Sequence, residues 1–285
     1  MITQRLDIPA PAKLNLFLHV IGRREDGMHL LESIFVLVDL KDEITLELDV
    51  NGTISRTGDI IGDPEKDLCI KAARMLQKVS GTQLGCRIHV RKHIPAGAGM
   101  GGGSSDCAST LLGLNQIWGL NWPQEKLLSL GEKLGADVPF FIFGHNAFAQ
   151  GTGGILEKID VPPAWAAILM PSSPTSTALI FQDPVLTRDT KSLKIPSLSQ
   201  QLVNQWPKLI GHNDLQSVAV RINPEIGLAL EALGSDARMT GSGSAVFALF
   251  KDEASARKAL TNIPQNMTGY AVKILQEHPY LANGR

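Results

Sequence analysis

The order of hydrophobic and polar positions predicts strands at the start of the chain. Residues 13–21 (KLNLFLHVI) have the alternating, β-rich character of a strand, and residues 33–40 and 43–50 repeat it with polar residues between them. Apolar residues then recur at helical spacing over residues 68–79, and residues 87–94 return to a strand pattern. This part of the chain is therefore predicted to be a set of strands interrupted by one helix.

The remainder of the chain alternates between the two kinds of pattern. Helices are predicted at residues 104–118, 123–134, 214–221, 224–233 and 253–260. Strands are predicted at residues 146–150, 155–159, 165–170 and 271–275, together with a strand–glycine–strand unit at residues 238–250. Because strands and helices alternate in both halves, the fold is predicted to be α+β or α/β.

Two consecutive prolines mark the predicted domain boundary. Pro162 and Pro163 disfavour both a helix and a strand ladder, and they favour an extended connection. The length of 285 residues also lies near the point at which one hydrophobic core gives way to two. We therefore expect two domains, at residues 1–162 and 163–285.

Composition and charge narrow the classes of function. The net charge is −1 and no basic stripe is present, so nucleic acid is not an expected partner. The first residues lack the apolar core of a signal peptide, and no apolar run approaches the roughly 20 residues that span a bilayer. We expect a cytoplasmic protein without a membrane partner. The sequence does not indicate its oligomeric state.

Cysteine and histidine spacing gives no sign of a metal site built by the protein alone. Cys69, Cys86 and Cys107 are widely spaced and form no CxxC pair, so neither a disulfide framework nor a zinc site is expected. The seven histidines are scattered and include no HExxH motif.

The run PAGAGMGGGSSDCAST is the strongest chemical signal in the sequence. It follows a predicted strand and begins a predicted helix, where unpaired backbone N–H groups and the positive end of the helix dipole attract an anion such as phosphate. Its glycines let the backbone approach a ligand closely, and its serines offer hydroxyls to phosphate or magnesium. The predicted nucleotide-binding residues here are Pro95, Ala96, Gly97, Ala98, Gly99, Met100, Gly101, Gly102, Gly103, Ser104 and Ser105.

The spacing of these glycines excludes two better-known nucleotide loops. Gly97, Gly99 and Gly102 form a GxGxxG pattern, but no acidic residue ends a strand about 20 positions later. Gly97 and Gly102 have Walker spacing, yet Gly103 occupies the position of the Walker lysine. A flexible surface loop is disfavoured because a linker does not normally separate a strand from a helix start. We interpret the run as a phosphate cradle that lacks its own lysine.

Two charged residues elsewhere are candidates for chemistry, each with a structural alternative. Lys13 lies among apolar residues of the first predicted strand, and Asn15 points to the same face. Phosphoryl transfer needs positive charge near the γ-phosphate, but the residues alone favour an ordinary strand lysine. Asp137 in LGADVPFF is either a helix N-cap, which the residues alone favour, or a carboxylate that accepts the proton of an attacking hydroxyl.

Three ordered motifs resemble those of the GHMP kinase superfamily: PAKLNLFLHV, PAGAGMGGGSSDCAST and MTGSGSAVFALF. The resemblance implies a two-domain α+β fold, with a ribosomal-protein-S5-type N-terminal domain, a ferredoxin-like C-terminal domain and an active site between them. It implies ATP with Mg²⁺, and it makes Lys13 and Asp137 the catalytic pair.

The phrases DGMHLLESIFVLVDL, LGADVPFFIFG and IFQDP look most like the branch of this superfamily that phosphorylates a cytidine diphosphate conjugate of methylerythritol at its 2-hydroxyl. This resemblance implies that Phe181 stacks on the cytosine. It also implies an adenine end at Asp67, Leu68 and Lys92, and further substrate contacts at Asn15, His29, Thr177, Gly241 and Gly243. The two last glycines also fit a plain tight turn between strands.

One position departs from the family pattern. Met28 stands where members often have an aromatic residue on the other side of the cytosine, so we expect weaker affinity for the base with an unchanged substrate. The alternatives are a sister kinase for homoserine, mevalonate or a sugar, and a nucleotide-sensing module without turnover. The sequence does not choose between Ser105 and Asp106 as the magnesium ligand.

Overall fold

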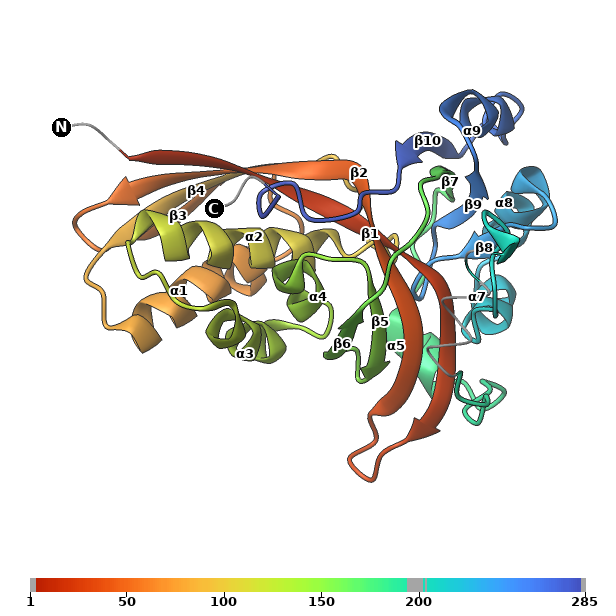
Figure 1. The fold of residues 1–285 in the computed structure, drawn as a ribbon, viewed down its shortest axis with the longest axis horizontal. Helices are drawn as coiled ribbons and strands as arrows, with labels where there is room; N and C mark the ends of the chain where they lie inside the picture. The colour runs from red at the N-terminus through yellow and green to blue at the C-terminus, as the bar shows by residue number, and fades with distance from the viewer. Residues whose placement is uncertain (1–3, 194–201, 203, 283–285) are drawn as a thin grey trace.

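The computed structural model describes residues 4–193, 202 and 204–282, and it contains two sheets built from successive parts of the chain (Figure 1). The first sheet has six strands: β1 (Arg5–Arg23), β2 (His29–Asp49), β3 (Ile54–Gly58), β4 (Gly85–Arg91), β5 (Ala147–Gly151) and β6 (Ile155–Lys158). The second has four strands in the order β10-β7-β9-β8: β7 (Trp165–Met170), β8 (Arg238–Met239), β9 (Val246–Phe250) and β10 (Thr268–Lys273).

A long antiparallel hairpin, β1 with β2, dominates the first sheet. The prediction of two strands at residues 33–40 and 43–50 is wrong, because β2 runs through both without a break. A register shift between Pro11 and Ala12 leaves Asp39 and Leu40 of β2 without partners in β1, as in a β-bulge, directly before the polar residues that suggested the break. Figure 1 shows the hairpin bending away from its sheet toward the second half of the molecule, where Leu18 bridges to Asn213.

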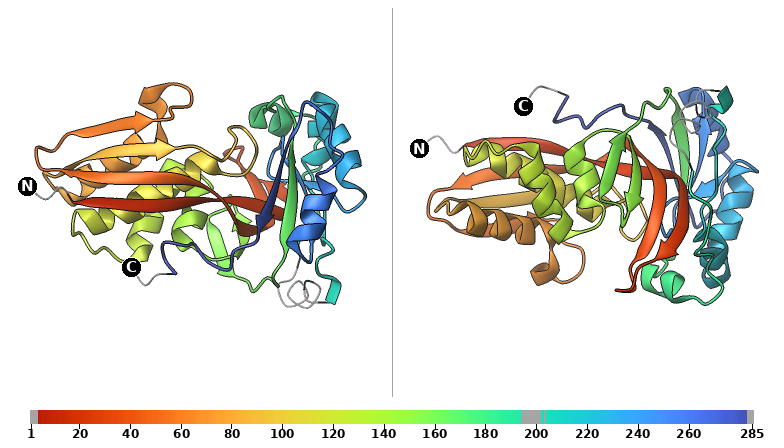
Figure 2. Two further views of the ribbon diagram at one scale, coloured as in Figure 1. Left: turned by 90° about the horizontal axis from the view of Figure 1, so that it is seen from above. Right: turned by 60° about the horizontal axis from the view of Figure 1, so that its bottom comes forward.

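Four helices cover one face of the first sheet (Figures 1 and 2): α1 (Leu68–Ser80), α2 (Gly102–Ile117), α3 (Gln124–Leu134) and α4 (Val138–Phe143). A short 3₁₀ segment, η1 (Pro64–Lys66), precedes α1. Helix α2 lies at the centre of this layer and is buried along most of its length, with Leu111 and Leu114 fully enclosed. Burial of such side chains stabilises the fold by roughly 1.5–3 kcal/mol each.

Three of the four described helices that follow the first half of the chain lie on the side of the second sheet away from that half, and the other, α5 (Thr177–Gln182), lies beside the β1–β2 hairpin (Figures 1 and 2). The three are α7 (Gln216–Ile222), α8 (Glu225–Leu233) and α9 (Glu253–Ala259). None of the helices in the described part of the chain has the length and apolar composition needed to cross a membrane.

Four of the described elements were not predicted: β3, η1, α4 and α5. Strand β3 (ISRTG) is short, largely polar and at the edge of its sheet, and α5 lies within a Ser-, Pro- and Thr-rich stretch that suggested a turn. The chain passes from one sheet to the other between Lys158 and Trp165, the segment that contains both prolines. The last part of the chain then returns to the first sheet. The Leu275 N–H donates to the Leu37 carbonyl of β2, and Tyr280 packs in the hydrophobic core between the first sheet and its helices.

The glycine-rich loop of the first half packs backbone against backbone on the loop between β8 and β9. A Cβ added at Gly99 would lie 2.3 Å from the Thr240 carbonyl oxygen, and one at Gly241 would lie 2.7 Å from the Gly99 oxygen. The Ala245 N–H donates to the Ala98 carbonyl at 3.2 Å across the same contact. No side chain fits here, so the glycines fix how the two loops meet.

This contact predicts that Gly99→Ala destabilises the protein more than Gly81→Ala. Both glycines have left-handed φ angles, +74° and +72°, so alanine costs each about 1 kcal/mol of backbone strain. Gly81 has open space around it, whereas at Gly99 the added methyl collides with backbone. We expect Gly99→Ala to lose a further ~1–3 kcal/mol in denaturant unfolding. Equal losses would contradict the close contact.

Candidate active site

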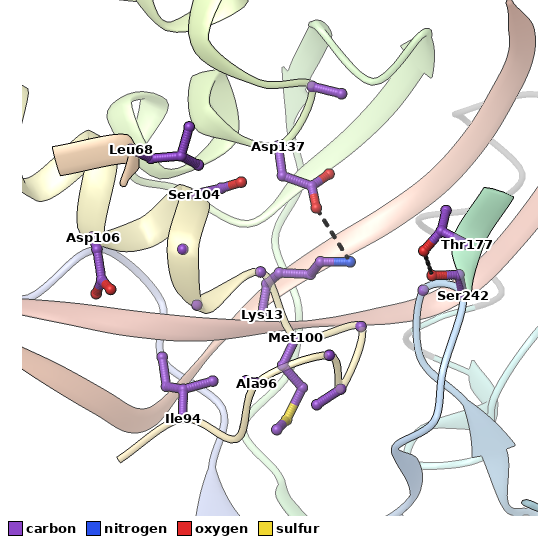
Figure 3. A pocket seen from close by; sticks show the side chains of 18 of the residues that line it. Lys13, Leu68, Ile94, Ala96, Met100, Ser104, Asp106, Asp137, Thr177 and Ser242 are labelled. Carbon is purple, nitrogen blue, oxygen red and sulfur yellow. Dashed lines mark hydrogen bonds and ion pairs between the residues drawn. The ribbon is translucent and has the colours of Figure 1, made fainter. Parts of the chain in front are cut away.

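A cavity of about 620 Å³ lies between the glycine-rich loop, β1 and the loop between β8 and β9 (Figure 3). The lining includes most of the residues predicted from sequence: Lys13, Asn15, Asp67, Leu68, Lys92, residues 95–104, Asp137, Thr177, Phe181, Gly241 and Gly243. Ser105, Met28 and His29 lie outside this lining. Segments that are far apart in the chain therefore meet at one cavity.

The glycine-rich loop presents the amino terminus of α2 to the cavity. Gly101 occupies the N-cap position with φ +72°, and no side chain caps the helix. The first N–H groups of a helix have no partner within it, so this end can bind an anion. Ser104 lines the cavity, whereas the Ser105 hydroxyl donates to the Pro11 carbonyl at 2.7 Å and is fully buried. The structure thus turns the Ser105 hydroxyl away from the cavity.

Lys13 lies directly beneath the loop, and its side chain is buried. Its Nζ donates to Asn15 Oδ1 and lies 5.2 Å from the centre of the Phe35 ring. Figure 3 shows the ammonium directed toward Asp137, with 3.8 Å between Nζ and Oδ2. Burial lowers the pKa of Lys13, while the charge of Asp137 acts in the opposite direction. The cavity thus contains a poorly solvated cation next to the uncapped start of α2.

Asp137 occupies the N-cap position of α4, but its side chain accepts no capping hydrogen bond. The residues alone favoured Asp137 as a helix cap. Its position agrees with that prediction, but the prediction that its side chain caps the helix is wrong. About a third of the Asp137 side chain is exposed (34%), and its carboxylate faces Lys13 across the cavity. A carboxylate in this position is accessible to a ligand, because it makes no hydrogen bond to the helix backbone.

The predicted adenine end is held by a buried group of charges. Lys92 Nζ lies between the carboxylates of Asp42 and Asp106, at 2.6 Å from the latter. Asp42 also accepts from the backbone N–H groups of His93 and Ile94, and so it fixes the start of the glycine-rich loop. Asp42 was missed, although a charged residue inside a strand pattern was a usable signal.

These charges perturb one another. Burial raises the pKa of Asp106 to about 7, an effect that Lys92 opposes and Asp42 adds to. Although burial acts in the opposite direction, Asp106 and Asp42 raise the pKa of Lys92. Asp67 accepts from two N–H groups at the start of α1 and pairs with Arg56 at 3.2 Å.

The other end of the cavity carries hydroxyl and ring groups. The Thr177 and Ser242 hydroxyls are hydrogen-bonded at 2.5 Å, which joins α5 to the loop between β8 and β9 (Figure 3). The Phe181 ring lies 4.8 Å from the His29 ring, centre to centre, so His29 meets the cavity lining through Phe181. Met28 is half exposed in the turn of the long hairpin. Ser242 was not predicted.

Comparison with known proteins agrees with this architecture. Residues 67–145 match the model of the GHMP kinases N terminal domain, and residues 195–269 match that of the GHMP kinases C terminal. The 4-diphosphocytidyl-2-C-methyl-D-erythritol kinase of Nitrosomonas eutropha is 47% identical over 95% of this chain and 97% of its own. That of Nitrosospira multiformis is 49% identical over 96% of this chain and 92% of its own.

Solved structures show the same fold. A crystal structure of 4-(cytidine 5'-diphospho)-2C-methyl-D-erythritol kinase superposes with a TM-score of 0.82 at 33% identity, over 94% of this chain and 99% of the other. A homoserine kinase from Cytophaga hutchinsonii, at 18% identity, superposes with a TM-score of 0.70 over 98% and 96% of the two chains. The two-part α+β fold predicted from the resemblance is confirmed. The chain belongs to the GHMP kinase family and is similar along nearly its whole length to the 4-diphosphocytidyl-2-C-methyl-D-erythritol kinases of that family.

Proposed function

We propose that this chain transfers the γ-phosphoryl group of ATP to the 2-hydroxyl of 4-diphosphocytidyl-2-C-methyl-D-erythritol, a step in the non-mevalonate synthesis of isoprenoid precursors. The names of relatives at 47–49% identity supply the substrate. The observation that carries the chemistry is the Lys13–Asp137 pair beside an uncapped helix start. We also propose a cytoplasmic location for the reaction. We keep 1–162 and 163–285 as the proposed domains.

In the proposed reaction the hydroxyl oxygen attacks the γ-phosphorus, and the bond to the leaving ADP oxygen breaks. Asp137 accepts the hydroxyl proton, since its carboxylate is accessible and makes no capping bond. The Lys13 ammonium orients that hydroxyl and stabilises the negative charge on the transferring group. Low solvation of Lys13 strengthens this effect, because charges interact more strongly where water is excluded.

The glycine-rich loop is proposed to hold the phosphates of ATP. The backbone N–H groups at the start of α2 supply the donors, and the absence of side chains at Gly101, Gly102 and Gly103 leaves room for the phosphate oxygens. Lys13 supplies the positive charge that a Walker loop obtains from its own lysine. The adenine is assigned to the end formed by Asp67, Leu68 and Lys92.

Mg²⁺ is proposed to enter with ATP. Within the described residues there is no group of three or more His, Cys, Asp and Glu side chains that could hold a metal. Mg²⁺ usually binds through one or two protein oxygens together with phosphates and water. Asp106 Oδ1 is buried without a hydrogen-bond partner, whereas the Ser105 hydroxyl is committed to Pro11. Asp106 would hold the ion, which would neutralise phosphate charge when bound.

The cytidine end of the substrate is assigned to the side of the cavity formed by Phe181, Thr177 and Asn15, with Gly241 and Gly243 closing over it. A phenyl ring provides a face on which a base stacks. Met28 and His29 are assigned to the same end, although they lie outside the cavity lining. The thioether of Met28 offers less area to the base than an aromatic ring.

A panel of alcohols tests this assignment. Purified protein with ATP and Mg²⁺ is expected to release ADP with the cytidine conjugate and not with homoserine, mevalonate or a sugar, because none of these has a base for the Phe181 ring. The assay couples ADP release to each alcohol in turn. Turnover of homoserine or mevalonate without turnover of the cytidine conjugate would overturn the proposal, and no turnover with any alcohol would favour a nucleotide sensor.

Asp137→Asn is expected to lower kcat by roughly 10²–10⁴-fold with ATP affinity nearly unchanged, because the amide keeps the shape of the side chain and does not accept the proton. Steady-state kinetics and ATP titration measure the two effects. Asp252→Asn is the matched control: Asp252 caps α9 through the Ser255 N–H at 2.8 Å and lies outside the cavity lining. Retained turnover in Asp137→Asn would remove Asp137 from the reaction.

Lys13→Met is expected to abolish turnover while leaving thermal stability unchanged or raised. Replacing a buried ion by an apolar side chain of similar volume is often neutral or stabilising, and Asn15 Oδ1 still accepts from the Thr240 hydroxyl at 3.2 Å. Because the pKa of Lys13 is lowered in the fold, the cost of its charge is greatest at low pH and declines as pH rises from the folded-state value toward the unfolded one.

The stability difference between Lys13→Met and the parent should therefore narrow in alkaline buffer. Ligand-free thermal unfolding between neutral and alkaline pH measures it. Marked destabilisation of Lys13→Met at neutral pH would contradict this, because it would show that the buried Lys13 ammonium stabilises the folded protein.

A further inference from the structure

Arg188 links the two aromatic residues at the substrate end of the cavity. Its Nε donates to His29 Nε2 at 3.1 Å, and its Nη2 donates to the Phe181 carbonyl at 2.9 Å. The same guanidinium donates to the carbonyls of Asp183 and Leu186, at 2.9 and 3.0 Å. One side chain therefore joins the start of β2 to the end of α5, which are far apart in the sequence.

Helix α5 depends on such a contact. It has six residues and no side-chain N-cap bond, and the end of a helix leaves carbonyl groups without partners inside the helix. Arg188 satisfies two carbonyls at that end, those of Phe181 and Asp183. Because Phe181 lies in the last turn of α5, holding its carbonyl also holds the ring that lines the cavity.

The bond to His29 has a second consequence. Since the Arg188 Nε–H is a donor, His29 Nε2 must accept, which fixes a neutral imidazole with its proton on Nδ1. The charged groups that act on this ring are Arg188, from the segment after α5, and Arg23, from the end of β1. Burial lowers the pKa of His29, and the two guanidinium groups lower it further.

We propose that Arg188 is a positioning residue for the nucleoside end of the substrate: it holds the Phe181 and His29 rings, 4.8 Å apart, in the arrangement that receives the pyrimidine base. This inference rests on the proposed function, because it assigns the base to these rings. Arg188 itself lies outside the cavity lining and acts through its neighbours. Its fork of N–H donors is required, since lysine offers a single ammonium in place of a planar fork.

Steady-state kinetics of Arg188→Gln and Arg188→Lys test the proposal. Both variants are expected to raise KM for the cytidine conjugate by roughly 10- to 100-fold, the range for a lost charged hydrogen bond, with KM for ATP and kcat little changed. The unchanged KM for ATP reports an intact fold. If Arg188→Gln does not fold, Arg188→Lys gives the same comparison.

The pH dependence separates positioning of His29 from a general weakening. Arg188→Gln removes a positive charge, so the pKa of His29 rises and the acid limb of kcat/KM for the cytidine conjugate moves to higher pH. Arg188→Lys keeps the charge, so its acid limb stays near that of the parent. Equal pH profiles of kcat/KM in the parent and Arg188→Gln would show that Arg188 does not influence the protonation of His29.

Arg221→Gln is the matched control. Arg221 pairs with the Asp183 carboxylate and so anchors the same end of α5, but it contacts neither ring in the described contacts. It is expected to leave KM for the cytidine conjugate unchanged. An equal rise in KM in Arg221→Gln and Arg188→Gln would reduce Arg188 to a general anchor of α5. A parent-like KM in both Arg188 variants would overturn the inference while the proposed function stands, and a parent protein that does not phosphorylate the cytidine conjugate would remove both.

Discussion

The site depends on the burial of one ammonium group, that of Lys13, beneath the amino terminus of α2. An ion taken out of water costs several kcal/mol unless its surroundings compensate for it. Here Asn15 Oδ1, the Phe35 ring and the Asp137 carboxylate compensate in part. The same burial explains a glycine at 101, since a Cβ there would lie 3.2 Å from Lys13 Cγ and 2.9 Å from the Phe141 ring.

From Lys13 the constraints extend to both halves of the molecule. The backbone N–H of the neighbouring Asn15 donates to the Thr240 hydroxyl oxygen at 2.9 Å, which ties β1 to the loop between β8 and β9. The loop between β8 and β9 also packs on Gly99. The same contact therefore determines how the two halves of the molecule meet and how the glycine-rich loop is shaped. On the far side, Asp42 fixes the start of the glycine-rich loop. The loop is therefore held by contacts at its start and at Gly99.

The sequence predicted what local pattern encodes and missed what only the tertiary fold creates. The strand–loop–helix unit at the phosphate site, and the absence of its own lysine, were readable from spacing alone. The residues alone favoured Asp137 as a helix cap because its partner, Lys13, is more than a hundred residues away, and only the resemblance to the GHMP kinases made it catalytic. Arg188 and Asp42 were missed for the same reason, since each acts through contacts with segments distant in the chain. Strand β3 is short and largely polar, and helix α5 has only six residues, too few to establish a helical period.

The central claim is that Lys13 and Asp137 face the transferring phosphoryl group and the attacking hydroxyl. A crystal structure with a non-hydrolysable ATP analogue and the cytidine conjugate tests it most directly. We predict a γ-phosphate oxygen within hydrogen-bond distance of Lys13 Nζ, the other phosphates on the backbone of residues 95–103, and the 2-hydroxyl within hydrogen-bond distance of the Asp137 carboxylate. Phosphates bound away from that loop, or a hydroxyl out of reach of Asp137, would contradict the account.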